Sequence, residues 1–205
     1  MRPTVRHLAW AGAILTPLLL IATLVLDGTD GPGQGDVAPV YAGILLALAV
    51  TAPCVVGLVI LRSRPGNRIG TILALGPLPI AVLAFCESYA IWGTADGGGT
   101  LPGRTWLGAV GASLWPAFYV WPLAIALLFP DGRPLSPRWR WAVALTIGAT
   151  LLACGTAALR EEPFDAPYDS VSPPVGVLPD AAAGVLMGVC LVLLTAALAL
   201  AAVAV

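Results

Sequence analysis

The chain has 205 residues, of which 59% are apolar and only 10% are charged. Soluble domains are roughly 45–50% apolar and about 25% charged, and disordered chains are still richer in charge, so this composition excludes both classes. A formal net charge of −1 gives no electrostatic basis for binding nucleic acid. The sequence therefore indicates an integral membrane protein, whose first partner is the lipid bilayer.

Six apolar stretches are long enough to cross a bilayer, since a hydrocarbon core of about 30 Å requires about 20 helical residues. Five of them contain no charged residue, and the third contains one, Glu87. They cover residues 8–26, 40–61, 69–92, 105–129, 141–159 and 181–205. The first is longer than the apolar core of a signal peptide and no small-residue cleavage site follows it, so we expect it to be retained. We predict an all-α fold in which residues 1–205 form one transmembrane domain, a bundle of six helices.

Arginines and acids alternate between the connections that join these stretches. The N-terminus and the connections 62–68 and 130–140 hold eight of the ten arginines, whereas the other three connections hold nine of the eleven acids. Basic residues near helix ends concentrate on the cytoplasmic side of membrane proteins, so we predict a cytoplasmic N-terminus. Six crossings then return the C-terminus to the cytoplasm. The pattern predicts a multi-pass membrane protein. All ten basic residues are arginine and none is lysine, which suggests the base composition of a GC-rich bacterium, so we expect a bacterial plasma membrane.

The connection 62–68 is short and contains the run Arg64-Pro65-Gly66-Asn67. Proline and glycine suit the two central positions of a type II turn, because glycine accepts a positive φ. Asn67 then suits the N-cap of the helix that follows. We expect a tight turn between antiparallel helices, with three arginines at the lipid surface, and a positively charged turn accounts for this segment without a further role.

The connection 130–140 contains several residues that end or start helices. Pro130 is typical of a helix end, and Asp131-Gly132 is a turn signal. Asp131 is the only acid in the connections predicted to be cytoplasmic, which suggests an ion pair with Arg133 or Arg138. Residues that end or start helices account for most of this connection as well.

Two motifs lie in these connections, about sixty residues apart. Their residues are Arg64, Pro65, Gly66, Asn67 and Gly70 in the first, and Phe129, Pro130, Asp131, Gly132, Arg133, Arg138 and Trp139 in the second. Together they resemble the membrane input region of actinobacterial sensor histidine kinases, in which an R-P-x-N-x-I-G turn opens one helix and an L-F-P-D-G-R-x-x-S-x-R-W segment joins two later ones. Tyr89, near the end of the third stretch, fits the same pattern loosely. The resemblance extends from the second stretch to the sixth.

The resemblance implies a two-component sensor, in which a cytoplasmic kinase core with a phosphoacceptor histidine and an ATP-binding domain phosphorylates a response regulator. This sequence contains none of those parts, and its one histidine is His7 in the N-terminal segment. We therefore expect a sensory input module that relays a signal through its last helix to a kinase core, with no catalytic residue, cofactor site or metal site of its own. The last stretch ends without an arginine or tryptophan, so we expect the natural chain to continue.

Two features within the stretches are candidates for signalling. Glu87 lies five residues from Trp92, near the outer end of its helix, where an acid either reaches the interface or senses a ligand or proton. Gly184 and Gly188 form a G-x-x-x-G pair, which allows close approach of two helices. The partner of that pair is either another helix of the same chain or the last helix of a second copy in a homodimer.

Two other classes of membrane protein remain open. A small transporter or channel-like protein is compatible with prolines inside the spans, but it should also show inverted repeats and polar groups at the midplane, and no clear repeat relates the two halves. A non-catalytic accessory subunit would need no ligand at all. The four cysteines all lie within apolar stretches and far apart, so we expect free buried thiols; they are Cys54, Cys86, Cys154 and Cys190.

Overall fold

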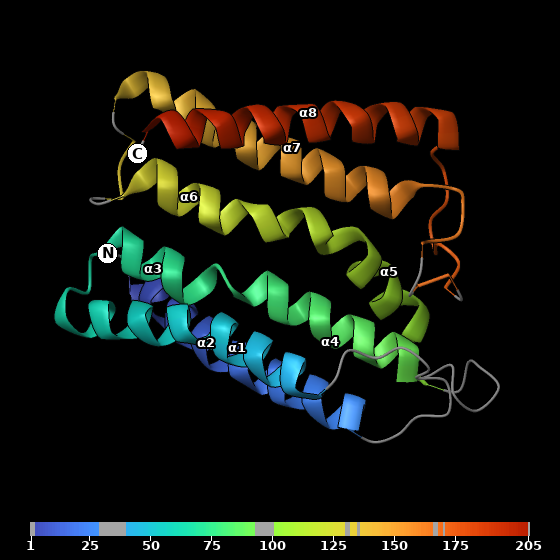
Figure 1. Ribbon diagram of the computed structural model, residues 1–205, viewed down its shortest axis with the longest axis horizontal. Helices are drawn as coiled ribbons and strands as arrows, with labels where there is room; N and C mark the ends of the chain where they lie inside the picture. Colours follow the sequence, from blue (N-terminus) through green and yellow to red (C-terminus); the bar gives the residue numbers. More distant parts are fainter. Residues whose placement is uncertain are drawn as a thin grey trace.

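Six helical segments run the length of the bundle in the computed structural model of the chain (Figure 1). The structure describes residues 3–28, 40–92, 101–129, 132–134, 136–165, 168–169 and 171–204. Within these residues, the segments long and apolar enough to cross a membrane are Val5–Gly28, Ala42–Ser63, Arg68–Trp92, Arg104–Leu128, Arg140–Leu159 and Asp180–Leu200. Each overlaps one predicted stretch, which confirms the prediction of an all-α fold with six segments long and apolar enough to span a membrane.

Four of the spans are formed by single helices, which are α1 (Pro3–Gly28), α2 (Val40–Ser63), α7 (Arg140–Leu159) and α8 (Asp180–Ala204). Pro17 and Pro53 lie inside α1 and α2 without ending them. Transmembrane helices tolerate proline, because neighbouring groups satisfy the carbonyl that loses its hydrogen bond. These two prolines therefore leave their spans undivided.

The third span is divided into α3 (Arg68–Leu75) and α4 (Leu78–Trp92) at Gly76-Pro77. Proline lacks the amide hydrogen that would continue the helical hydrogen bonds. Its ring also clashes with the carbonyl group four residues earlier in a continuous helix. Gly76 also contacts the next half of the molecule, since a Cβ placed there would lie 2.6 Å from Cβ of Trp121. The interruption therefore combines a proline with a close helix contact.

The fourth span is divided as well, into α5 (Arg104–Leu114), the 3₁₀ helix η1 (Trp115–Tyr119) and α6 (Val120–Leu128). Pro116 is buried near the start of η1, where a missing amide is least costly. Trp121 in α6 contacts Gly76, so the interruptions of the third and fourth spans lie side by side. A proline therefore accompanies both interruptions, Pro77 in the third span and Pro116 in the fourth.

The helices form two halves, α1–α4 and α5–α8, which meet where α4 packs on α5 and α3 on α6 (Figure 1). Successive spans run in opposite directions, so α1 begins and α8 ends at the same end of the bundle. We call this the arginine-rich end, because every charged residue that the structure describes there is an arginine. The opposite end holds the connection 160–180 and lies nearest to all the acids among the described residues, and we call it the acidic end.

Close contact between α2 and α3 depends on a glycine. A Cβ placed on Gly57 would lie 2.6 Å from the amide nitrogen of Ala74 and 2.7 Å from the carbonyl oxygen of Gly70. Small residues at helix contacts allow backbones to approach in this way. Gly70, a residue of the first motif, therefore has a packing role at the α2–α3 contact.

The turn between α2 and α3 differs from the prediction in one respect. Asn67 caps α3 as expected, with its Oδ1 accepting a hydrogen bond of 2.9 Å from the amide of Gly70. The expected type II turn at Pro65-Gly66 is wrong, because the described residues with positive φ are Gly103 and Gly132. The Asn67 amide donates to the carbonyl of Arg64 at 3.0 Å, so the turn closes without a left-handed residue and leads directly into α3.

Candidate functional site

The two sequence motifs meet at the arginine-rich end. Nη1 of Arg68, the first residue of α3, donates a 3.3 Å hydrogen bond to the carbonyl of Gly132. Gly132 has φ +69°, and its amide donates to the carbonyl of Leu128 at 2.7 Å, which closes the end of α6. A Cβ on Gly132 would overlap Cβ of Arg68. The two connections are therefore packed on one another although 64 residues separate Arg68 from Gly132.

The structure describes only part of the second motif. Pro130 and Asp131 lie outside the described residues, as does the side chain of Arg138, so the expected ion pair of Asp131 stays a prediction. Trp139 is half-buried in a cluster with Leu123 and Ala197. Its indole thereby joins the start of α7 to α6 and α8.

A cavity of about 830 Å³ opens beside the motif contact. Arg68 and Arg140 contribute its charged groups, and Ile72, Val143 and Ile147 contribute apolar walls. Both arginines are exposed. This composition suits the boundary between lipid headgroups and acyl chains.

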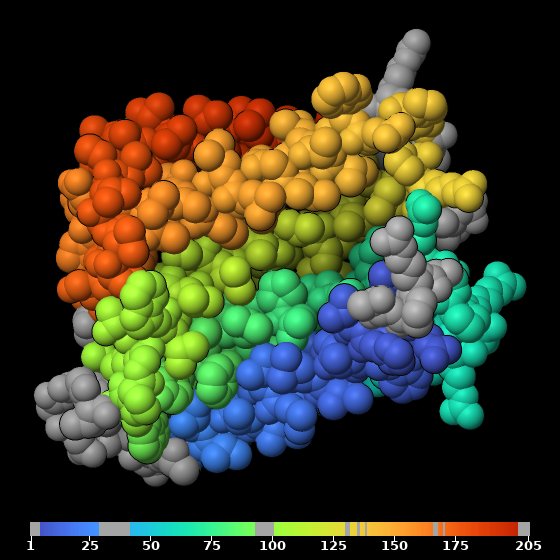
Figure 2. Space-filling view, turned by 180° about the vertical axis from the view of Figure 1, so that it is seen from behind, coloured from blue at the N-terminus to red at the C-terminus, as the bar shows by residue number. Residues whose placement is uncertain are grey.

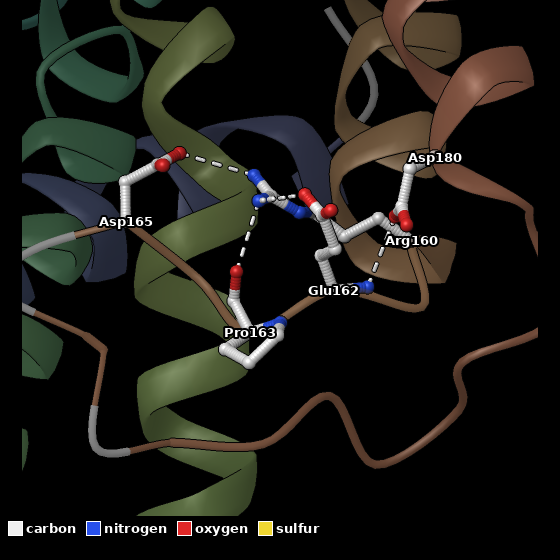
Figure 3. A network of polar contacts seen from close by, with 5 residues as sticks. All are labelled: Arg160, Glu162, Pro163, Asp165 and Asp180. Carbon is white, nitrogen blue, oxygen red and sulfur yellow. Dashed lines mark hydrogen bonds and ion pairs between the residues drawn. The ribbon is translucent and has the colours of Figure 1, made fainter.

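At the acidic end, the connection between α7 and α8 is fixed by a network around Arg160 (Figure 3). The guanidinium pairs with Asp165 at 3.0 Å and with Glu162 at 3.8 Å, and it donates to the carbonyl of Pro163 at 2.9 Å. The Glu162 amide donates to Oδ1 of Asp180, the first residue of α8, at 3.1 Å. The connection is therefore tied to both of the helices that it joins.

The same connection packs apolar side chains into the bundle. Phe164, Tyr168 and Val171 are buried against Ala90 of α4 and Ala109 of α5. Figure 2 shows this connection, in orange and red, beside the start of α5 at the acidic end. These contacts were not predicted from the sequence, although two aromatic residues in a Pro- and Asp-rich connection indicate burial.

A second cavity, of about 560 Å³, lies under this connection, between α4, α5, α7 and α8. Glu87 of α4 lines it and is half-buried, as are Trp115 and Arg160, and the buried Tyr168 lines it as well. Volumes of this size are typical of sites for small organic ligands. Glu87, the one charged residue predicted within a span, thus lies in the wall of a cavity rather than in contact with lipid alone.

Tyr168 is the most unusual group in this cavity. Its side chain is only 7% exposed, and its hydroxyl is buried with no hydrogen-bond partner among the described residues. Burial raises the pKa of the phenol, and the neighbouring Glu87 carboxylate raises it further, so the hydroxyl is protonated at neutral pH. A Cβ on Gly111 would lie 2.5 Å from this hydroxyl, which shows how closely the ring is packed on α5.

The remaining signalling candidates lie in different environments. The Tyr89 hydroxyl donates to the carbonyl of Pro102 at 2.9 Å and ties α4 to the segment before α5. Gly184 lines the cavity, but a Cβ on either Gly184 or Gly188 would meet nothing within 4 Å in the described part of the chain. Neither glycine therefore provides a close intramolecular helix contact, and the alternative, a homodimer contact, stays a prediction.

The cysteine residues are free thiols, as the sequence predicted. All four cysteines are free, with Cys54, Cys86 and Cys190 buried and Cys154 half-buried, as expected. The chain matches no protein-family model, no curated protein and no solved structure. The resemblance to kinase input regions therefore stays a prediction based on the two motifs.

Proposed function

We propose that the chain is the membrane-embedded sensory input module of a histidine kinase, with the acidic-end cavity as its signal-binding site. Its arginine-rich end faces the cytoplasm in this proposal, and α8 leads to a cytoplasmic kinase core that acts on a response regulator. The observation that carries the proposal is the position of α8 in the wall of the cavity. Asp180, Ala183, Gly184 and Met187, from its first two turns, all line the cavity.

Helix α8 is suited to relay a change over the length of the bundle. At a rise of about 1.5 Å per residue, its 25 residues span about 37 Å. It packs mainly on α7, while its outer face is open, with Val185 and Val192 each 68% exposed. A ligand that fits one position of α8 better than another would shift the population of the two positions, and so the state of a dimeric kinase core.

The test joins α8 in helical register to a histidine kinase core and measures phosphorylation of the response regulator at equal membrane protein levels. Glu87→Gln and Gly184→Leu change the cavity, and we expect each to shift basal output at least about twofold, because the two positions of α8 differ by only a few kcal/mol. Asp169→Asn is the matched control, since Asp169 is exposed in the same connection and does not line the cavity. Unchanged output from both cavity variants would refute a sensory role for the cavity.

A small transporter is the second candidate, and the interrupted spans favour it. The breaks of the third and fourth spans lie side by side at Gly76 and Trp121, and transporter sites are commonly formed by broken helices near the midplane. Nε1 of Trp121 is buried without a partner in the described residues. However, no acidic or basic side chain lies at these breaks in the part that the structure describes.

Uptake by proteoliposomes separates the two functions. Labelled tetraethylammonium crosses protein-free bilayers slowly, so uptake above the protein-free background would indicate transport. The sensory proposal predicts no such uptake. Uptake that falls when Trp121→Phe removes the buried indole nitrogen would favour the transporter.

A further inference from the structure

We infer that the acidic-end cavity binds an amphiphilic organic cation, in which one positive charge is attached to an apolar body. The inference rests on the proposed function only for the consequence of binding, and it names the chemical class of the signal. Charge, aromatic lining, an unpartnered buried hydroxyl and the apolar wall each support it.

The cavity has an excess of negative charge. Among the described residues, four acids and one basic residue line it. The acids are Glu87, Glu162, Asp165 and Asp180, and the basic residue is Arg160. When all four acids are ionised, the cavity has three negative charges in excess. Arg160 is already engaged by Asp165, Glu162 and a backbone carbonyl. It is therefore not available to neutralise Glu87.

Glu87 is the carboxylate for which the fold supplies no partner. No hydrogen bond or ion pair to its side chain is present in the described part of the chain, and another acid outside the cavity, Asp27, lies close enough to repel its charge. By contrast, Asp180 accepts a hydrogen bond from Glu162 and lies at the N-terminus of α8, where the helix dipole favours a negative charge. A half-buried acid without a cation is costly, and a positively charged ligand would offset that cost.

Aromatic rings and a buried hydroxyl without a described partner add to the site. Trp115, Phe164 and Tyr168 line the cavity, and the faces of aromatic rings attract organic cations. The Tyr168 hydroxyl, 7% exposed as part of its side chain and without a described partner, is available to the bound molecule. Such a buried polar group is normally hydrogen-bonded, so its lack of a protein partner points to a ligand or water in the cavity.

Most of the remaining wall is apolar, which indicates the chemistry of the rest of the ligand. Leu83, Ala112, Ala157 and Met187 all line the cavity. A small hydrated ion would leave these side chains without contacts, whereas an organic cation fills the space and buries apolar surface. The ligand is therefore expected to carry hydrocarbon or aromatic groups around its charge.

Binding is tested with two probes of the same shape and opposite charge, tetraphenylphosphonium and tetraphenylborate. The full 205-residue chain is placed in nanodiscs of zwitterionic phosphatidylcholine, and equilibrium dialysis measures binding above that of empty nanodiscs. We expect saturable binding of the cation and none of the anion. Equal binding of both probes, or of neither, would overturn the inference without requiring any variant to fold.

Two variants then locate the site. Glu87→Gln should weaken tetraphenylphosphonium binding about tenfold through loss of the opposing charge, and Tyr168→Leu about fivefold through loss of an aromatic ring that attracts the cation. Asp169→Asn and Tyr119→Leu remove a charge and an aromatic ring outside the cavity, and both should bind like the unmodified chain. Unchanged affinity of a well-folded Glu87→Gln variant would show that the cation does not bind beside Glu87 and would overturn the proposed site.

The binding experiment and the kinase experiment can fail independently of one another. If the cavity variants shift kinase output but the cation does not bind, the sensory function stands and the ligand class is wrong. If the cation binds at Glu87 but no cavity variant shifts output, the binding site stands and the proposed sensory function fails.

Discussion

Replacing Gly57 by alanine should destabilise the contact between α2 and α3. The new Cβ would lie 2.6 Å from the Ala74 amide nitrogen and 3.0 Å from Ala74 Cα, whereas ordinary contacts start near 3.4 Å, so the helices must separate by roughly 0.8 Å. Overpacking of this kind costs about 1–3 kcal/mol, because the atoms in the way belong to the backbone. Alanine regains about 1 kcal/mol of helix propensity, which leaves a net loss of roughly 0–2 kcal/mol.

The matched control is Gly148→Ala in α7, where an added Cβ meets nothing within 4 Å. It should be neutral or stabilising by up to about 1 kcal/mol. Both variants are compared by reversible unfolding in mixed micelles of increasing sodium dodecyl sulfate content, followed by circular dichroism. The reasoning would be refuted if Gly57→Ala were as stable as Gly148→Ala.

Three further predictions concern the turns and the orientation. Gly132→Ala should cost about 1–2 kcal/mol in the same unfolding assay, because its φ is +69° and its Cβ would overlap Arg68. Gly66→Ala should be nearly neutral, since a Cβ there meets nothing within 4 Å. Equal costs would contradict the difference between the two turns. Asn67→Ala should cost about 1 kcal/mol through loss of the helix cap, and retained stability would show that another group satisfies the Gly70 amide. Reporter fusions at Gly66 should read as cytoplasmic and fusions at Pro173 as external, and the reverse readout would overturn the orientation proposed from the arginines.

The spans could be predicted from the sequence because a bilayer requires about 20 apolar residues, and that requirement is local. Their interruptions could not. Pro17, Pro53, Pro77 and Pro116 all lie within apolar stretches, yet only the last two accompany a break. A break depends on what a neighbouring helix supplies, as Trp121 does at Gly76, and composition does not contain that information.

The candidate site could be predicted only in part for the same reason. Glu87 was identified because a charge within a span is costly wherever the span packs. Tyr168 was missed because its burial depends on packing against Ala90, Ala109 and Gly111, residues far away in the sequence. The contact between Arg68 and Gly132 likewise could not be predicted from the sequence, because each of the two connections was explained as an isolated turn.

The central claim is that an occupant of the acidic-end cavity shifts α8 at the opposite end of the bundle. Double electron–electron resonance tests it directly, with spin labels at Arg64→Cys in the α2–α3 turn and Leu200→Cys near the end of α8, and with the four native cysteines replaced by alanine. Both positions are exposed. Saturating tetraphenylphosphonium should change the distance distribution, and Glu87→Gln should abolish that change. An identical distribution with and without the cation, under conditions in which dialysis shows the site to be filled, would contradict the account.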